Sequence, residues 1–337
     1  MKNIAVLFPC REEVKERLEK AAPNCHFDFL EELTVAEREE YIKRADAIIG
    51  EPELEELQLA KQLSWLQISW AGTDKYTKRE DFPEQVVLTN TTGVFGESMA
   101  EWLLGVLLSI YKKLPDYRDR QREHSWKDMG KEKNLYGKTV LILGVGDIGT
   151  SFARLLSVFG TKTIGVGRRK REDIEVLQGQ ASQKLELQKK YFHKLYTTEA
   201  LDELLPKADV VVMALPDTKE TKGLMDLRRL RLLKEDAVLL NVGRGTTLVT
   251  KDLITVLKEG KLYGVGLDVM TPEPLPENSP LWEFDRVLLT PHIAGKGLGH
   301  LDETYDGIVA IFEENIKRFA CGEPLLNVVD VEAGYKI

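Results

Sequence analysis

The sequence predicts an α/β protein with two mainly parallel sheets, and three observations lead to that prediction. Its 337 residues suffice for about two domains of roughly 150 residues each. Short apolar runs alternate with charged segments of helical period along most of the chain, which is typical of βαβ units. In the second half the apolar runs are nearly continuous, as expected of parallel strands covered on both faces.

The N-terminal part of the chain carries apolar runs that we interpret as buried strands, separated by helical patterns. The expected strands are Ile4–Phe8, Ala47–Gly50, Leu66–Ile68 and Val86–Leu88. The expected helices are Glu12–Ala22, Val35–Arg44 and Leu54–Leu63. Because strands and helices alternate, this part is expected to form a parallel sheet. A long helix, Glu97–Leu114, follows and ends at Pro115, and a polar stretch continues to Trp126.

A second alternating series starts after Trp126 and predicts the second sheet. Its expected strands are Thr139–Leu143, Thr163–Val166, Val210–Ala214, Val238–Asn241, Gly264–Asp268 and Val287–Thr290. The chain closes with a helix near Leu301–Phe319, ended by Gly322. The boundary between the sheets falls in or beside the helix that begins at Glu97. The charged, Gln-rich segment Lys170–Lys190 is interpreted as a surface helical segment whose composition indicates no chemistry.

The charge balance argues against nucleic acid and membrane surfaces as partners. Lys and Arg total 47 against 55 Asp and Glu, a net charge of −8, so phosphate backbones and anionic lipids are repelled. No apolar stretch approaches the roughly 20 residues that a transmembrane helix requires, and the N-terminal run Ile4–Phe8 is too short for a signal peptide. The three cysteines lack metal-like spacing. We therefore expect a cytoplasmic protein without a metal site.

A glycine-rich turn, Gly144-Val-Gly-Asp-Ile-Gly149, directly follows a predicted strand and opens a predicted helix. Gly144 permits a tight turn, Gly146 lets backbone amides approach a pyrophosphate, and Gly149 lets helix and strand pack closely. The helix N-terminus at Asp147 and Ile148 supplies N–H groups and a positive dipole end for that anion. This context favours a dinucleotide site over a bare strand–helix turn.

The end of the next predicted strand carries basic residues where an NAD-preferring site places a carboxylate. Gly167 occupies the position expected to bind the ribose 2′-hydroxyl, and Arg168 and Arg169 follow it. Guanidinium groups suit a 2′-phosphate because they bind it through paired N–H donors. A solvated basic loop is the alternative. The sequence therefore favours NADP(H), with NAD(H) possible.

Three later segments carry polar residues at the C-terminal ends of predicted strands, where open α/β sheets bind ligands. They contain Arg244, then Asp268 with Glu273, and finally His292. Taken singly, each is equally well explained as an ordinary loop or surface residue. With the glycine turn they form an ordered set of motifs: GVGDIG, ALPDTKET (Ala214–Thr221), NVGRG (241–245), LDVMTPEPLP (Leu267–Pro276) and LTPHIAG (289–295).

This ordered set resembles the D-isomer-specific 2-hydroxyacid dehydrogenase family over nearly the whole chain, from the Trp70-Ala-Gly-Thr-Asp74 loop to the closing helix. The resemblance implies two doubly wound parallel-sheet domains. A Rossmann dinucleotide-binding domain, residues 97–292, would be inserted in a flavodoxin-like substrate domain, residues 1–96 plus 293–337. A homodimer is also expected, because in the family the region of the apolar helix packs across a two-fold axis. The helix repeats apolar residues at core spacing: Trp102, Leu103, Val106, Leu107 and Ile110.

The resemblance also implies roles for individual residues. His292 would protonate the carbonyl oxygen of the substrate, and Glu273 would stabilise the imidazolium. Arg244 would bind the 2-oxo acid and polarise its carbonyl. Asp268 would orient the nicotinamide carboxamide. The other residues implied to contact the cofactor are Leu215, Pro216, Thr221, Val242 and Gly243.

The substrate side of the site is implied to lie in the N-terminal part of the chain. Backbone N–H groups of Ala71 and Gly72 would receive the substrate carboxylate, beside Trp70. The pocket wall is expected around Glu51, Pro52 and Trp70, although its shape does not follow from the sequence.

The predicted function is NAD(P)H-dependent reduction of a small 2-oxo acid to a D-2-hydroxy acid. Glyoxylate, hydroxypyruvate and a bulkier acid such as ketopantoate are all open as substrates. Glu273 favours this chemistry, since relatives that oxidise formate carry Gln at that place. The alternative is a dinucleotide-sensing regulator similar to animal corepressors, which can keep the catalytic residues. The complete residue set favours the enzyme.

Overall fold

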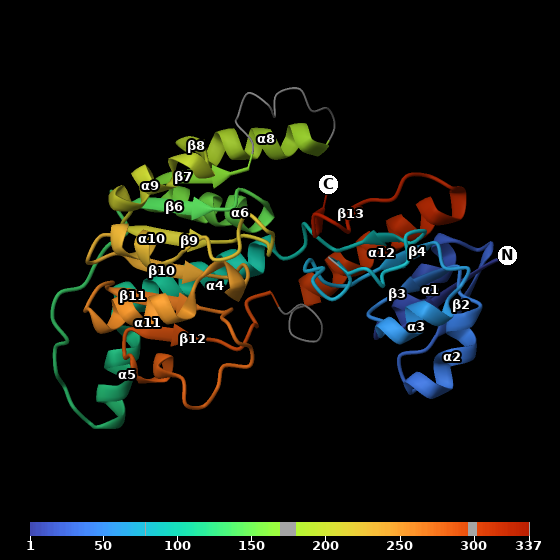
Figure 1. Cartoon of the computed structure of the whole chain (residues 1–337), viewed down its shortest axis with the longest axis horizontal. Coiled ribbons are helices and arrows are strands. Elements are labelled where there is room, and N and C mark those ends of the chain that lie inside the picture. Colours follow the sequence, from blue (N-terminus) through green and yellow to red (C-terminus); the bar gives the residue numbers. More distant parts are fainter. Residues whose placement is uncertain (78, 169–179, 296–301, 337) are drawn as a thin grey trace. The chain divides into compact units, whose positions relative to one another are not determined.

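Two compact units make up the chain, whose computed structural model describes residues 1–77, 79–168, 180–295 and 302–336 (Figure 1). Unit 1 consists of Met1–Val94 with Gly297–Ile337, and unit 2 of Phe95–Lys296. Unit 2 is therefore inserted within unit 1 along the chain. The boundaries expected from the sequence differ slightly, at 96 against 94 and at 292 against 296.

Unit 1 is built on a parallel five-stranded sheet in the order β2-β1-β3-β4-β5. Its strands are β1 (Lys2–Val6), β2 (Cys25–Phe29), β3 (Ala47–Ile49), β4 (Trp65–Gln67) and β5 (Val87–Thr89). The helices are α1 (Glu12–Ala21), α2 (Val35–Lys43), α3 (Leu54–Leu59) and α12 (Asp302–Cys321). α1 packs against α12, and α2 packs against α3. This strand order is the doubly wound, flavodoxin-like arrangement that was predicted. A short antiparallel pair follows α12: β13 (Val329–Asp330) and β14 (Tyr335–Lys336).

Local sequence explains why these elements begin and end where they do. Val6 and Ile4 of β1 are fully buried, as a central strand requires. α2 starts after Thr34, whose hydroxyl accepts from the Glu37 N–H (3.4 Å) while the Glu37 carboxylate accepts from the Thr34 N–H (2.9 Å). β2 was not predicted, because its five residues, CHFDF, lie half-exposed at the sheet edge and form no apolar run.

Unit 2 contains a parallel seven-stranded sheet in the order β12-β11-β10-β9-β6-β7-β8. The strands are β6 (Thr139–Leu143), β7 (Lys162–Gly167), β8 (Lys194–Thr197), β9 (Val210–Met213), β10 (Val238–Asn241), β11 (Gly264–Leu267) and β12 (Val287–Leu289). Its α-helices are α4 (Gly96–Tyr111), α5 (Leu114–Arg122), α6 (Asp147–Leu156), α8 (Gln180–Tyr191), α9 (Leu201–Leu204), α10 (Leu227–Leu232) and α11 (Thr250–Lys258). The short 3₁₀ segments are η1 (Ser157–Phe159), η2 (Thr198–Ala200), η3 (Leu205–Lys207), η4 (Gly245–Thr247) and η5 (Pro280–Glu283).

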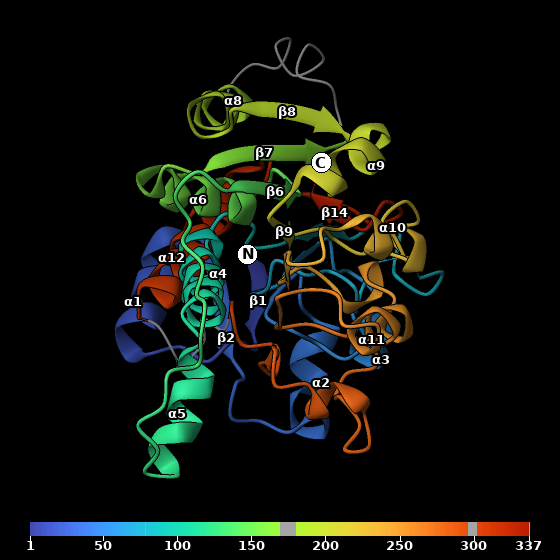
Figure 2. The same cartoon turned by 90° about the vertical axis from the view of Figure 1, so that its left-hand side faces the viewer.

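Helices cover both faces of this sheet, with α4, α6 and α8 on one side and α9, α10 and α11 on the other (Figure 2). Counted from β6, the order is the Rossmann arrangement with one further strand at the β12 edge. The reversal of strand order falls between β6 and β9, which places the carboxyl ends of these strands at a topological switch point.

α4 packs directly on β11 because two residues of that strand lack side chains. A Cβ at Gly264 or Gly266 would overlap Ile110 or Val106 of α4. Leu103 and Leu107 are fully buried on the same helix. Of the apolar stripe expected from the sequence, Leu103, Leu107 and Ile110 are therefore core, as the helical spacing predicted, whereas Trp102 and Val106 are partly exposed.

The region after α4 differs from the prediction. α4 ends at Tyr111, before the predicted end at Leu114, and Pro115 lies in the first turn of a second helix, α5, where the sequence predicted a polar stretch. Proline is tolerated there because the N–H groups of a first turn have no intrahelical acceptor.

Within the described residues, no helix is long and apolar enough to cross a membrane.

A buried ion pair ties α2 to α3 in unit 1. Arg38 donates from Nε to Glu56 Oε1 (2.6 Å) and from a terminal nitrogen to Oε2 (2.8 Å). The Glu56 side chain is only 1% exposed, and it also accepts from the Glu53 N–H (2.7 Å). Without its partner, this carboxylate would be a buried, uncompensated charge.

We therefore expect Arg38→Ala to lower the free energy of unfolding by about 3 kcal/mol, the usual cost of breaking a buried pair. Urea unfolding followed by circular dichroism measures it. Lys43→Ala is the control, since its ion pairs to Glu39 and Glu40 are exposed and contribute at most about 0.5 kcal/mol each. Equal losses for the two variants would contradict the assignment.

Candidate functional site

The glycine turn between β6 and α6 has backbone packing that only glycine allows. Gly144 has a φ of +102°, and a Cβ there would overlap the carbonyl oxygen of Ala214 at the end of β9. A Cβ at Gly149 would overlap the carbonyl oxygen of Gly144. These contacts hold the start of α6 against the ends of β6 and β9.

Gly146 has a different environment from its two neighbours. A Cβ at this position would meet no described atom within 4 Å, so internal packing does not require glycine here. The N–H groups of Ile148 and Gly149, in the first turn of α6, find no acceptor among the described residues. An open backbone next to unpaired N–H groups fits the pyrophosphate of a dinucleotide.

Gln188 on α8 also contacts this turn, and sequence reasoning missed it. Its side chain is 4% exposed and donates to the carbonyl of Val145 (2.5 Å). The Val145 side chain in turn lies over β7, where Cβ atoms at Gly165 or Gly167 would overlap it. The segment Lys170–Lys190 was expected to carry no chemistry. Its residues 170–179 lie outside the described part, but its end holds the turn, which only the fold reveals.

Arg168 is exposed and directly follows β7, the strand next to the glycine turn. Hydrogen bonding from Thr218 lowers the pKa of Glu220, and the charge of Arg168 adds to that shift, so Arg168 lies near the loop that follows β9. Arg169 lies outside the described residues. The position of Arg168 beside the turn is compatible with a ribose phosphate, as the sequence suggested.

His292 and Glu273 are brought together from two different loops. His292 Nδ1 donates to Glu273 Oε2 (2.9 Å), and Glu273 Oε1 accepts from the Met270 N–H (2.8 Å). The histidine side chain remains 50% exposed and the glutamate 35% exposed. With Nδ1 bonded to a carboxylate, Nε2 is the ring nitrogen left to exchange a proton with a ligand.

The backbone of His292 is held in an unusual conformation, with a φ of +55°. Non-glycine residues adopt this region at a cost of roughly 1–2 kcal/mol. Two contacts stabilise it: the His292 N–H donates to the carbonyls of Asp268 (2.9 Å) and Thr290 (3.0 Å). A strained, exposed histidine fixed by its own backbone is typical of a functional position.

Asp268 organises the loop that carries His292. The side chain is 1% exposed, and its Oδ1 accepts from the Thr290 hydroxyl (2.5 Å) and the Ile293 N–H (2.8 Å). Its Oδ2 accepts from the Ala294 N–H (3.0 Å). The carboxylate therefore bonds residues on both sides of His292, a positioning role that the sequence did not suggest. Its expected contact with the nicotinamide stays a prediction.

Arg244 follows β10 in a turn flanked by two glycines. A Cβ at Gly243 would overlap the backbone of Leu215, and one at Gly245 would overlap the carbonyl of Met270. The Arg244 carbonyl accepts from Asn241 Nδ2 (3.2 Å) and from the Thr247 hydroxyl (2.7 Å). The half-buried guanidinium donates to the Gly243 carbonyl (2.9 Å).

The remaining expected cofactor contacts lie around the same strand ends. Leu215 and Val242 are buried, whereas Pro216 is exposed. Thr221 is also buried, and its hydroxyl donates to the Pro216 carbonyl (2.6 Å) and accepts from the Thr218 N–H (2.9 Å). Thr221 thus braces the loop after β9, and its predicted contact with a cofactor stays a prediction.

The loop Trp70–Gly72 in unit 1 is fixed through its carbonyl groups. The Ser69 carbonyl accepts from the Thr91 hydroxyl (2.7 Å) and the Trp70 carbonyl from the Thr91 N–H (3.2 Å). The Ala71 carbonyl accepts from Asn90 Nδ2 (2.8 Å). The N–H groups of Ala71 and Gly72 donate to no acceptor among the described residues. Two adjacent unpaired amides suit an anion such as a carboxylate.

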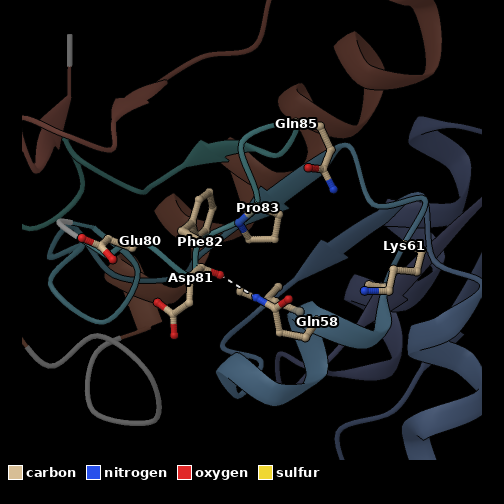
Figure 3. Close-up of a pocket in the computed structure, with 9 residues that line it drawn as sticks. Gln58, Lys61, Glu80, Asp81, Phe82, Pro83 and Gln85 are labelled. Carbon is tan, nitrogen blue, oxygen red and sulfur yellow. Dashed lines mark hydrogen bonds between the residues drawn. The ribbon is translucent and has the colours of Figure 1, made fainter.

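Unit 1 also has an open hollow elsewhere, between α3 and the segment that precedes β5 (Figure 3). Gln58 crosses it and donates to the Asp81 carbonyl (2.6 Å). Its lining residues are Leu57, Gln58, Ala60, Lys61, Glu80, Asp81, Phe82, Pro83 and Gln85. The hollow shares no residue with the predicted site, and its lining mixes buried apolar side chains with exposed polar ones.

Residues 104–294 match the family model described as D-isomer specific 2-hydroxyacid dehydrogenase, NAD binding domain. A glyoxylate reductase from Thermofilum pendens is 34% identical over 247 residues, covering 71% of this chain and 68% of the relative. A solved D-isomer specific 2-hydroxyacid dehydrogenase family protein from Aeromonas salmonicida is 32% identical with a TM-score of 0.82, covering 98% and 99%. A solved NADPH-dependent glyoxylate/hydroxypyruvate reductase from Sinorhizobium meliloti, in complex with NADP and sulfate, is 26% identical with a TM-score of 0.78, covering 99% and 100%.

A Rossmann sheet with a glycine-rich phosphate turn and a histidine–carboxylate pair defines a dinucleotide-dependent enzyme. The chain belongs to the D-isomer-specific 2-hydroxyacid dehydrogenase family, so it is an NAD(P)-dependent oxidoreductase. The family and the fold class expected from the sequence are both confirmed.

The Gln188 contact yields a test of how the turn is held. Gln188→Leu removes the donor to the Val145 carbonyl, so the turn loses one hydrogen bond and we expect the Kd for NADPH to rise about fivefold. Titration of dinucleotide fluorescence measures it. Gln58→Leu is the matched control, because it removes a similar glutamine-to-carbonyl bond in unit 1. An unchanged Kd in Gln188→Leu would show that α8 does not support the turn.

Proposed function

We propose that this protein reduces small 2-oxo acids, glyoxylate and hydroxypyruvate among them, to D-2-hydroxy acids with NADPH as the preferred reductant. The observation that carries the proposal is the His292–Glu273 pair, exposed at the edge of the sheet that also carries the dinucleotide turn. The reductases named among the relatives support the substrate class.

In this proposal the chain supplies charge and a proton, while the bound dinucleotide supplies hydride to the carbonyl carbon of the substrate. His292 gives its Nε2 proton to the carbonyl oxygen as that oxygen gains electrons, so a hydroxyl forms and the imidazole becomes neutral. Glu273 holds the ring through Nδ1 and stabilises its cationic form before transfer. Solvent restores the proton, since the ring is half-exposed.

Two further groups would bind the substrate. The Arg244 guanidinium would donate to the carbonyl oxygen and the carboxylate, contacts that strengthen as negative charge builds on the oxygen. The unpaired N–H groups of Ala71 and Gly72 would receive the substrate carboxylate. The glycines on either side of Arg244 are needed for the close backbone packing that positions the turn carrying Arg244.

The preference for NADPH rests on Arg168 and on the absence of a carboxylate at the end of β7. Two solved relatives, each 26% identical, carry NADPH or NADP. Two of the named relatives are reductases, which favours the enzyme over the corepressor-like alternative. Ketopantoate as a substrate, a homodimer and a cytoplasmic location remain predictions from the sequence.

The reaction is tested by the loss of reduced-nicotinamide absorbance with glyoxylate, hydroxypyruvate or ketopantoate. We expect His292→Ala to lower kcat about a thousandfold, because general acid catalysis contributes roughly 10²–10⁴. The Kd for NADPH should stay unchanged. His26→Ala serves as the control, since that exposed histidine lies in unit 1, where its side chain bonds Asp28. A near-normal rate in His292→Ala would remove this residue as the acid.

The cofactor preference is tested by Arg168→Ala. Loss of the guanidinium should raise the KM for NADPH about tenfold and leave that for NADH nearly unchanged, because only NADPH carries the 2′-phosphate. Arg122→Ala on α5 removes the same charge at an exposed position elsewhere and should affect neither. Equal effects on the two cofactors would mean that Arg168 does not bind the 2′-phosphate.

A further inference from the structure

Glu51 presents one unused carboxylate oxygen at the carboxyl edge of the unit 1 sheet. It follows β3 after Gly50, and its Oε1 accepts from both the N–H and the hydroxyl of Ser69 (2.7 Å each). No described residue donates to Oε2. The side chain is half-buried, and burial raises its pKa against the opposing effects of Ser69 and Lys75.

This carboxylate lies close to the loop that is proposed to receive the substrate carboxylate. Ser69, which it bonds, is two residues before Ala71. Two residues of extended chain span at most about 7 Å, so Glu51 Oε1 lies within roughly 10 Å of the Ala71 N–H. A three- or four-carbon acid with a hydrogen bond at each end spans a similar distance. Its second polar group can therefore reach Glu51.

No lysine or arginine among the described residues forms an ion pair with Glu51. Lys75, whose charge acts on Glu51, has its ammonium paired with Glu53 (3.2 Å). Glu56 on α3 is bonded by Arg38. A half-buried acceptor of this kind is stabilised by a donor and destabilised by another negative charge.

We propose that Glu51 selects the substrate by the group on its C3 atom, an inference that rests on the proposed reductase function. Oε2 accepts a hydrogen bond from a C3 hydroxyl, and its charge disfavours a second carboxylate at that end of the substrate. The preferred class is therefore the monoanionic 2-oxo acid with a hydrogen-bond donor on C3. Glyoxylate, which has no C3, does not contact Glu51.

Pyruvate, hydroxypyruvate and oxaloacetate test this directly, because they carry hydrogen, hydroxyl and carboxylate on the same carbon. For the wild-type protein we expect kcat/KM to fall in the order hydroxypyruvate, pyruvate, oxaloacetate. In Glu51→Gln the hydroxypyruvate-to-pyruvate ratio should fall about tenfold, the effect of losing a charged acceptor. The oxaloacetate-to-pyruvate ratio should rise about tenfold, since the repulsion is removed.

Glu51→Gln keeps a carbonyl oxygen that can accept from Ser69, so the loop is expected to remain folded; circular dichroism and urea unfolding check this. Glu55→Gln is the matched control. It removes the same charge at an exposed side chain in the first turn of α3 and leaves the Glu53–Lys75 pair intact, so both ratios should stay within about twofold of wild type.

The outcomes separate this inference from the function on which it rests. If the wild-type protein reduces glyoxylate but Glu51→Gln leaves both ratios unchanged, Glu51 does not select the substrate and the reductase function stands. A wild-type protein that prefers oxaloacetate to pyruvate would overturn the inference without any variant. If no 2-oxo acid is reduced with either cofactor, the proposed function fails and this inference fails with it.

Discussion

Close backbone contact at the carboxyl ends of the central strands of unit 2 is the constraint on which the rest of the site depends. Gly144 and Gly243 lie against the backbone of Ala214 and Leu215, and Gly245 lies against Met270. Side chains at these positions would overlap main-chain atoms that cannot move without displacing a strand. The glycines therefore let the loops after β6, β9, β10 and β11 converge, which brings the phosphate turn and Arg244 to one edge.

A buried carboxylate completes this arrangement for His292. Asp268 directly follows β11, and its two oxygens accept from Thr290, Ile293 and Ala294 on the loop after β12. A carboxylate bonded by three donors tolerates burial that an unpaired one would not. Glu273 adds a second tether, to the ring itself. His292 is thus held through its backbone by Asp268 and through its imidazole by Glu273, while half of its side chain stays exposed.

Sequence reasoning succeeded where a residue's role depends on the backbone conformation of its own local segment. Gly144 and Gly149 were assigned to the turn because their positions relative to a strand and a helix define the motif, and the packing agrees. It failed at β2 and β8, since edge strands need apolar residues on one face at most. It also failed at α5, because Pro115 was interpreted as the end of the preceding helix, although proline is equally favourable in the first turn of a new one.

The sequence alone determined the two parallel sheets, the dinucleotide turn and the family, because apolar periodicity and glycine spacing are local properties of the chain. Only the tertiary structure decided which side chains meet. Gln188 is 43 residues from the Val145 carbonyl it bonds, and Glu51 is 18 residues from Ser69. Nothing in the spacing of such pairs marks them, since they become neighbours only when crossover connections bring separate strand ends to one edge of a sheet.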